Sequence, residues 1–309
     1  MFFKKKKWLI TLFLGIALLV FIITRLSLKE LIFTLTGVNY RYLIMGLFLG
    51  FLPTIFRSLR FWYFFRNEGK GLLLIGVFSV MRLMNTIFPM RSGEFIFLKL
   101  LKNKKLSPSI SETLSVWLFL RMLDVLALSL FFVAFIGLSE IRVHFQKVLI
   151  ILGIVIVVII ALISCLQFFK RRKKINSAKS WIANRINVFK DGFHRIKGIF
   201  AFIWTLILSI LIWGSLIMTL VMGLLAFNTP LDMGKCFIAA LIGLTFSILP
   251  IHAPFGIGTG EAMWSGILIT LGVHIKEALA IVIAIRLFTI CIILINSFVG
   301  LFIIRCQAE

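Results

Sequence analysis

Seven charged residues lie within or beside long apolar stretches of the sequence, where an ionised side chain is costly. They are Arg82, Arg91, Glu94, Arg121, Asp124, Glu261 and Arg286. On membrane-insertion scales an ionised residue at the centre of a bilayer costs about 2.5 kcal/mol or more, so charges that persist there need a partner or a function. These residues are therefore the first candidates for a binding site.

Two breaks in the apolar pattern each end on a glutamate that follows glycine. Glu94 follows Gly93 in the sequence FPMRSGE, and Glu261 ends the sequence LPIHAPFGIGTGE, which contains Gly256 and Gly258. We expect a short helix to begin at each glutamate, with free backbone N–H groups at its N-terminus. Such N-termini attract phosphate and carboxylate groups, and glycine allows these groups a close approach.

Arginines near both breaks suit the same kind of ligand, because a guanidinium binds phosphate through paired hydrogen bonds. Asp124 lies three residues after Arg121, on the same face of a helix. We expect the acidic side chains to balance charge or to bind a basic group of the ligand. The predicted substrate-binding residues are Arg91, Gly93, Glu94, Arg121, Asp124, Gly256, Gly258, Glu261 and Arg286.

Purely structural roles for several of these residues stay open at this point. Arg121 and Asp124 can form an internal salt bridge that closes the helix bundle. Glu94 and Glu261 can cap the helices that they begin, where a carboxylate also gains from the helix dipole.

Three other polar residues in apolar segments have simpler interpretations. Arg57 and Arg60 share one face toward the end of their segment, and we expect both to extend toward lipid headgroups. Asn85 lies three residues after Arg82 and can hold neighbouring helices together by hydrogen bonding.

The composition indicates a membrane protein. Of the 309 residues 61% are hydrophobic and 15% are charged, with a mean hydropathy of +1.10, whereas soluble domains are roughly 45 to 50% apolar. This excludes an ordinary cytosolic enzyme, a secreted disulfide scaffold and a disordered tail. The net charge of +23 is concentrated in short loops between apolar segments, which is typical of membrane orientation and argues against nucleic-acid binding.

The apolar segments predict an all-α fold, a polytopic transmembrane helical bundle that forms a single domain over residues 1–309. A full crossing needs about 20 residues. Proline and glycine interrupt the segments 72–105 and 234–272, and a broken helix is stable at membrane depth only inside protein or beside water. We therefore predict two re-entrant helical hairpins there. The predicted full crossings are 8–24, 43–65, 112–138, 148–169, 199–227 and 278–304.

Loop charges predict the orientation of this bundle. The loops assigned to the inner side hold 21 Lys and Arg residues, and those assigned to the outer side hold seven. This bias predicts that both termini lie in the cytoplasm. No small-residue cleavage site follows the first span, so we expect this span to be retained rather than removed as a signal peptide. The basic segment 170–198 is predicted to be an interfacial amphipathic helix on the cytoplasmic leaflet. A full crossing by residues 72–88 stays open as an alternative.

The two hairpins have similar sequence order, which indicates an internal repeat. Glu94 precedes Arg121 by 27 residues, and Glu261 precedes Arg286 by 25 residues. Each unit has a broken helix, a glutamate after glycine, a short helix and then a long helix with an arginine inside it. Three predicted crossings separate the hairpins, and an odd number makes the repeat inverted, an arrangement that places transporter sites near the midplane.

Motifs for soluble enzyme chemistry are absent from the sequence. It contains no HExxH, GxSxG or P-loop pattern, and its four histidines are widely scattered. GIGTGE resembles a dinucleotide loop, but no strand precedes it and no βαβ unit surrounds it. We therefore predict no catalytic residue, no metal and no cofactor.

Three motifs in order resemble the lysylphosphatidylglycerol synthase transmembrane region family, also called flippase-like. They are NTIFPMRSGEFIFLKLL (residues 85–101), RMLD (residues 121–124) and LPIHAPFGIGTGE with the later Arg286. The resemblance covers essentially the whole chain. Phe255 stands where relatives commonly have glycine, and Leu120 stands where they often have an acidic residue, so the substrate need not be identical.

The resemblance implies a flippase-like protein of the bacterial cytoplasmic membrane. Its cargo would be an anionic or glycosylated phospholipid, or a polyprenyl-phosphate-linked lipid, moved between leaflets. Some relatives attach the bundle to a cytoplasmic synthase that aminoacylates phosphatidylglycerol, and others stand alone and are linked to polysaccharide or glycolipid assembly. This chain ends at Glu309, soon after its last predicted span, so we expect no synthase activity.

The partners that we expect are the membrane phospholipid or lipid-linked glycan and a synthase or glycosyltransferase. Two alternatives stay open. One is a membrane-embedded glycosyl or phosphoryl transferase that uses Glu94 or Glu261 as its base, and the other is a non-catalytic scaffold for a synthase.

Overall fold

The computed structural model describes residues 28–65, 71–88, 93–103, 110–138, 199–247 and 258–307. Within these ranges all regular secondary structure is helical, which confirms the all-α fold class for this part of the chain. The helices are α2 (Leu28–Thr36), α3 (Tyr40–Phe65), α4 (Gly71–Ile87), α5 (Gly93–Asn103), α6 (Ile110–Leu138), α9 (Ile199–Ala226), α10 (Met233–Ser247), α11 (Thr259–Thr270) and α12 (Ile275–Cys306).

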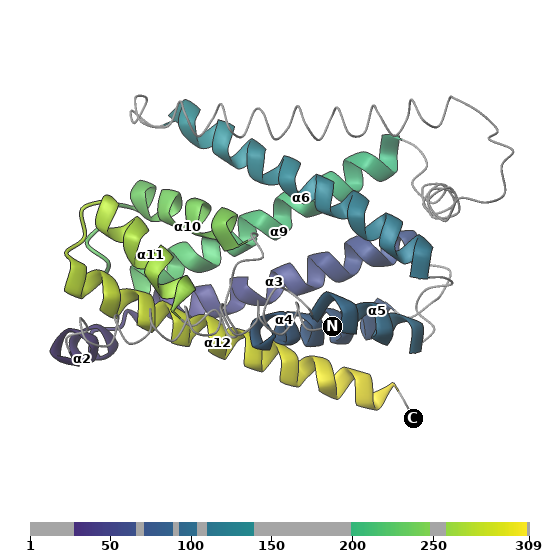
Figure 1. The fold of residues 1–309 in the computed structure, drawn as a ribbon, viewed down its shortest axis with the longest axis horizontal. Helices are drawn as coiled ribbons and strands as arrows, with labels where there is room; N and C mark the ends of the chain where they lie inside the picture. Colours follow the sequence, from purple (N-terminus) through teal and green to yellow (C-terminus); the bar gives the residue numbers. More distant parts are fainter. Residues whose placement is uncertain are drawn as a thin grey trace, which may run out of the picture.

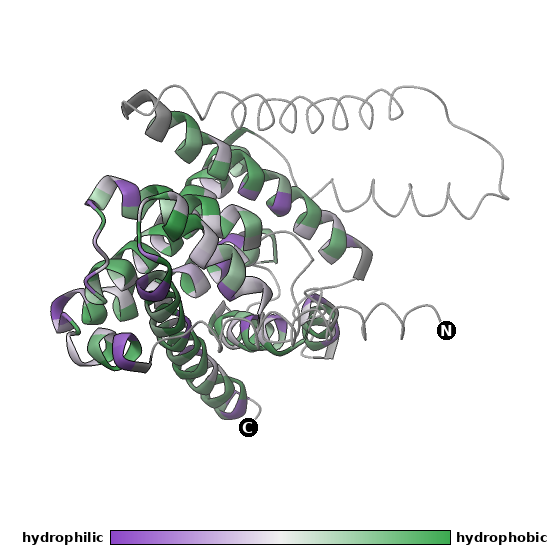
Figure 2. Ribbon diagram, turned by 60° about the vertical axis from the view of Figure 1, so that its left-hand side comes forward, coloured by the Kyte–Doolittle hydropathy of each residue, from purple (hydrophilic) through white to green (hydrophobic). Residues whose placement is uncertain are grey.

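Four of these helices are long and apolar enough to cross a membrane, namely α3, α6, α9 and α12. They coincide with four of the six predicted crossing segments. The predicted spans at 8–24 and 148–169 and the amphipathic segment at 170–198 lie outside the described residues. Figure 2 shows α12 as apolar along most of its length, and Phe298 on this helix is 75% exposed, as expected for a surface that contacts lipid.

The two predicted breaks separate short helices in the described ranges. α4 ends at Ile87 and α5 begins at Gly93, while α10 ends at Ser247 and α11 begins at Thr259. α4 has 17 residues and α10 has 15, fewer than the roughly 20 that a crossing needs. The re-entrant path of these helix pairs stays a prediction, as does the alternative of a full crossing by residues 72–88.

Eight of the described helices form two units of four, which we call the first unit (α3 to α6) and the second unit (α9 to α12), while α2 packs on α12. Equivalent helices make equivalent contacts: α4 of the first unit packs on α12, α10 of the second packs on α6, and α3 packs along α9. In Figure 1, α3 and α12 run toward the end of the molecule where the C-terminus lies, and α6 and α9 run the opposite way. Equivalent helices therefore run in opposite directions, as in an inverted-topology repeat.

Each unit has its own apolar core. The core of the first unit is rich in phenylalanine: the rings of Phe61 and Phe65 stack with centroids 4.6 Å apart, and those of Phe78 and Phe97 lie 4.8 Å apart. The second core is built mainly from α9, α10 and α12, with α6 contributing residues such as Leu128. Aromatic pairs of this kind add stability to the first core beyond the area that they bury, while the second core depends on both units.

The turn of α3 that precedes Pro53 links the two units. Pro53 is buried inside this helix, where proline removes a backbone donor and disturbs the preceding turn. The carbonyl of Gly50 in that turn accepts hydrogen bonds from Arg82 Nη1 of α4 (2.9 Å) and from Asn296 Nδ2 of α12 (3.4 Å). Side chains of both units are thus held at one turn of α3.

Small residues bring α4 and α12 unusually close. A Cβ atom added to Gly76 would lie 2.7 Å from the carbonyl oxygen of Gly300, and Ser297 Oγ donates to the carbonyl of Ser79 at 3.2 Å. Close backbone approach through small residues is a common way for helices to associate in membranes, because the hydrophobic effect does not drive helix association within lipid.

Replacing Gly76 by valine is expected to separate α4 from α12 and to destabilise the protein by about 1 to 3 kcal/mol, the usual cost of overpacking. The measurement is thermal unfolding of the purified protein in detergent. Gly266→Val is the matched control, because a Cβ at Gly266 in α11 meets nothing within 4 Å. Equal melting temperatures for the two variants would contradict the close packing described above.

Candidate functional site

A cavity of about 330 Å³ lies between the two apolar cores. Both units line it, and the ends of both helix breaks reach it, since Thr86 belongs to the end of α4 and Gly260 to the start of α11. The polar and aromatic lining residues used below are Arg57, Arg60, Arg82, Asn85, Trp117, Arg121 and Asp124 from the first unit, and Trp213, Glu261, Trp264, Arg286 and Thr289 from the second.

Equivalent ion pairs occur in the two units. Glu94 in the first turn of α5 pairs with Arg121 of α6, and Glu261 in the first turn of α11 pairs with Arg286 of α12 at 3.7 Å. Each pair joins the short helix that follows a break to the next long helix. The two arginines both line the cavity, so each pair also places a cation at its wall.

A third ion pair, which is buried, closes the site toward α9. Arg60 Nη1 of α3 lies 2.5 Å from Asp124 Oδ1 of α6 and donates to Ser209 Oγ of α9 at 2.6 Å, while Arg60 Nη2 lies 3.3 Å from the other carboxylate oxygen. Arg60 and Asp124 are 5% and 6% exposed. A two-pronged contact of this kind is the strong form of the arginine–carboxylate bond.

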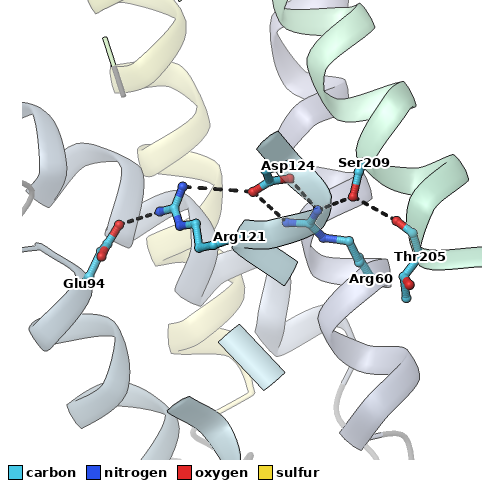
Figure 3. Close-up of polar contacts among 6 residues, drawn as sticks. All are labelled: Arg60, Glu94, Arg121, Asp124, Thr205 and Ser209. Atoms are coloured by element: carbon cyan, nitrogen blue, oxygen red, sulfur yellow. Dashed lines mark hydrogen bonds and ion pairs between the residues drawn. The ribbon is translucent and has the colours of Figure 1, made fainter. Parts of the chain in front are cut away.

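These contacts form one continuous polar row, which Figure 3 shows from Glu94 through Arg121, Asp124 and Arg60 to Ser209. Arg121 Nη1 lies 4.0 Å from Asp124 Oδ2, so the pairing within α6 is the weakest link of the row. The sequence had left open an Arg121–Asp124 salt bridge. Both residues in fact have closer partners on other helices.

The prediction that Arg57 and Arg60 extend toward lipid headgroups is wrong for Arg60. Its side chain points inward to Asp124 because a carboxylate is available there, and an ion pair avoids the cost of a lone charge in the apolar interior. Arg57 lies on the same face of α3, one turn earlier, and lines the cavity. Both residues are thus part of the site.

Glu261 does not cap its helix. The N-cap of α11 is Gly258, whose φ of +79° favours glycine, and no side chain caps this helix. Glu261 instead faces Arg286, as described above. At the other break, a Cβ on Gly93 would lie 2.6 Å from the backbone N of Asn85, so only glycine allows α5 to begin so close to the end of α4.

Two of the predicted substrate-binding residues, Arg91 and Gly256, lie outside the described residues. The other seven lie at the two helix starts, along the polar row, or, for Arg286, beside Glu261 on α12: Gly93, Glu94, Arg121, Asp124, Gly258, Glu261 and Arg286.

Four buried polar atoms have no hydrogen-bond partner within the described ranges, and all of them belong to residues that line the cavity. They are Arg60 Nε, Asn85 Oδ1, Trp213 Nε1 and Glu261 Oε2. Buried polar groups are normally paired, because an unmade hydrogen bond costs about 1 to 3 kcal/mol. Unpaired donors and acceptors around one cavity are typical of a site that a polar ligand completes.

Residues 8–296 match the family model described as the lysylphosphatidylglycerol synthase TM region. The chain belongs to this family. The match covers nearly the whole sequence and confirms the resemblance inferred from the three motifs. Comparison with curated proteins and with solved structures finds no match.

Membership of the lysylphosphatidylglycerol synthase TM region family, together with the four long apolar helices, makes the chain a multi-pass membrane protein. The family model describes a transmembrane region and brings no catalytic domain with it. The breaks, ion pairs and cavity described above are therefore features of a membrane domain.

Asp124→Asn is expected to destabilise this family member strongly, because it leaves Arg60 charged and buried. Removing one partner of a buried pair typically costs about 3 to 5 kcal/mol. Thermal unfolding in detergent measures the effect, and a joint Arg60→Met and Asp124→Leu replacement is expected to recover most of the loss, since no bare charge remains.

The control is Asp232→Asn. Asp232 directly precedes α10 and forms an exposed ion pair with Lys235 (3.6 Å). The backbone N–H of Lys235 also donates to the Asp232 carboxylate, which lowers the pKa of Asp232 below its usual value. This exposed pair is expected to change the melting temperature little. Similar losses for Asp124→Asn and Asp232→Asn would contradict the structural role of the buried pair.

Proposed function

We propose that the protein is a flippase-like carrier, which moves an anionic or glycosylated phospholipid, or a polyprenyl-phosphate-linked lipid, between the leaflets of the bacterial cytoplasmic membrane. The observation that carries this proposal is the arginine-rich cavity that both broken-helix units reach. Family membership supports the membrane setting. The lipid phosphate enters the cavity and the acyl chains stay in the hydrocarbon.

The lining of the cavity supports an anionic ligand. Arg121 and Arg286 both line the cavity and pair with their glutamate partners. The start of α11, where Gly260 and Glu261 line the cavity, adds backbone N–H groups, which favour anions at a helix N-terminus. Asp124 and Glu261 balance the arginines and offer acceptors for a hydroxyl or amino group of the lipid.

The arrangement of the two units supports alternating access. Transporters built from inverted repeats expose a fixed central site first to one side and then to the other, by rocking one unit against the other. Here α3 and α9 run side by side between the units, and the cavity lies between the two cores. In our proposal the units pivot about this helix pair, and both termini lie in the cytoplasm.

Reconstitution into vesicles with a fluorescent phosphatidylglycerol in the inner leaflet tests the proposal. We expect the labelled lipid to reach the outer leaflet without covalent change. A new lipid product would instead favour a transferase. If neither leaflet exchange nor a new product is observed, the result would favour a non-catalytic scaffold for a synthase. Chromatography of the extracted lipids separates these outcomes.

Glu261→Gln is expected to slow the exchange about tenfold or more, because it removes the charge that positions Arg286, and a charged hydrogen bond is worth about 1.5 to 3 kcal/mol. Glu277→Gln is the matched control, since Glu277 lies in the first turn of α12 and does not line the cavity. Full exchange by a folded Glu261→Gln protein would count against the proposed site.

A further inference from the structure

Arg57 and Arg82 carry the unbalanced charge of the cavity. Arginine lines it at five positions, and three of these have carboxylate partners: Asp124 for Arg60, and the two glutamates for Arg121 and Arg286. Neither Arg57 nor Arg82 forms an ion pair within the described ranges. Among the described residues, Arg82 donates only to the carbonyl of Gly50, which supplies a dipole but no negative charge.

Asp124, the carboxylate that lines the cavity on α6, is already paired with Arg60, and the two connections at the helix breaks offer no further acid for Arg57 and Arg82. The stretches that connect α4 to α5 and α10 to α11, residues 88–92 and 248–258, contain no aspartate or glutamate. Two cations therefore face a cavity within an apolar bundle with nothing in these connections to balance them. Since arginine stays protonated in proteins, an anionic ligand would offset the cost of both charges.

The excess charge lies on one side of the cavity. Arg57 on α3 and Arg82 on α4 belong to the first unit, whereas the charged lining residues of the second unit, Glu261 and Arg286, pair with each other among apolar residues such as Leu244 and Val282. This division gives the ligand a direction, with its phosphate against the first unit and its apolar part against the second.

Unpaired hydrogen-bonding atoms in the same cavity as Arg57 and Arg82 favour a ligand with polar groups over a simple inorganic ion. Glu261 Oε2 and Asn85 Oδ1 are unpaired acceptors, and Trp213 Nε1 is an unpaired donor, within the described ranges. Glu261 and Trp213 are 7% and 3% exposed. A phosphate that also carries hydroxyl groups offers both the acceptors and the donors that these atoms lack.

We propose that Arg57 and Arg82 together select lipids whose phosphate bears two negative charges, a phosphomonoester or a pyrophosphate, over phosphodiester lipids with one. A dianion neutralises both arginines, whereas a monoanion leaves one of them bare in the cavity. This inference rests on the proposed function for the lipid nature of the ligand, and it assigns specificity to two residues of the same site.

The test compares two lipids that differ by one methyl group and one charge. Phosphatidic acid and phosphatidylmethanol with identical acyl chains are titrated into the purified full chain in detergent, and bound lipid is counted by native mass spectrometry. At about pH 8.5 the phosphomonoester is a dianion, because its second pKa is about 6. We expect phosphatidic acid to bind about tenfold more tightly, which corresponds to about 1.4 kcal/mol.

Arg57→Gln and Arg82→Gln are each expected to reduce this preference to about threefold or less, since each removes one of the two charges. Arg57→Lys and Arg82→Lys keep the charge and are expected to keep most of the preference. They also cover the case in which a glutamine variant does not fold. Arg41→Gln is the matched control, because Arg41 lies in the first turn of α3 and is exposed.

Equal affinities of the wild-type protein for the two lipids, with leaflet exchange of phosphatidylglycerol intact, would overturn this inference and leave the proposed function standing. A clear preference without exchange of any lipid would overturn the proposed function instead. Displacement of bound phosphatidic acid by an equal concentration of inorganic pyrophosphate would show a site for soluble anions, and it would contradict selection among lipids.

Discussion

The structure depends on one constraint: an apolar medium cannot solvate charges or open backbone groups, so the protein must satisfy them internally. Most of the charged residues of the described bundle interior meet around one cavity, and they pair across helices rather than along them. Arg60 and Asp124 show this most clearly, because α3 and α6 are held together through two buried side chains that would otherwise each cost several kcal/mol. The same constraint explains why both helix breaks end beside the cavity.

The two units have similar helices that run in opposite directions, but they balance their interior charges with different residues. Both pair the glutamate of a short helix with an arginine of the following long helix. Three residues after that arginine, the first unit has Asp124, which binds Arg60, while the second has Thr289, whose hydroxyl donates to the carbonyl of Arg286 in its own helix. The first unit thus anchors a charged network to α9, and the second presents a more neutral wall.

The sequence predicted the features that depend on local pattern. Proline and glycine predicted the two helix breaks, and the length of the apolar segments predicted the four long helices. The repeated spacing of glutamate and arginine predicted the two similar units. It could not predict contacts between distant segments: Arg60 meets Asp124 across 64 residues and Ser209 across 149. Helical periodicity shows which residues share a face but not what that face meets. For this reason Arg57 and Arg60 were assigned to lipid headgroups, although only the packing of α3 against α6 and α9 decides where they point.

The central claim is that both broken-helix units reach one cavity, and cross-linking tests it directly. Thr86→Cys at the end of α4 and Gly260→Cys at the start of α11 both face the cavity, and a Cβ at Gly260 meets nothing within 4 Å. In a background without the four native cysteines, a short bifunctional thiol reagent is predicted to join this pair within one chain. It is predicted not to join Thr86→Cys to Gly266→Cys, which lies farther along α11 and outside the lining. Efficient cross-linking of the second pair, or none of the first, would contradict the shared cavity.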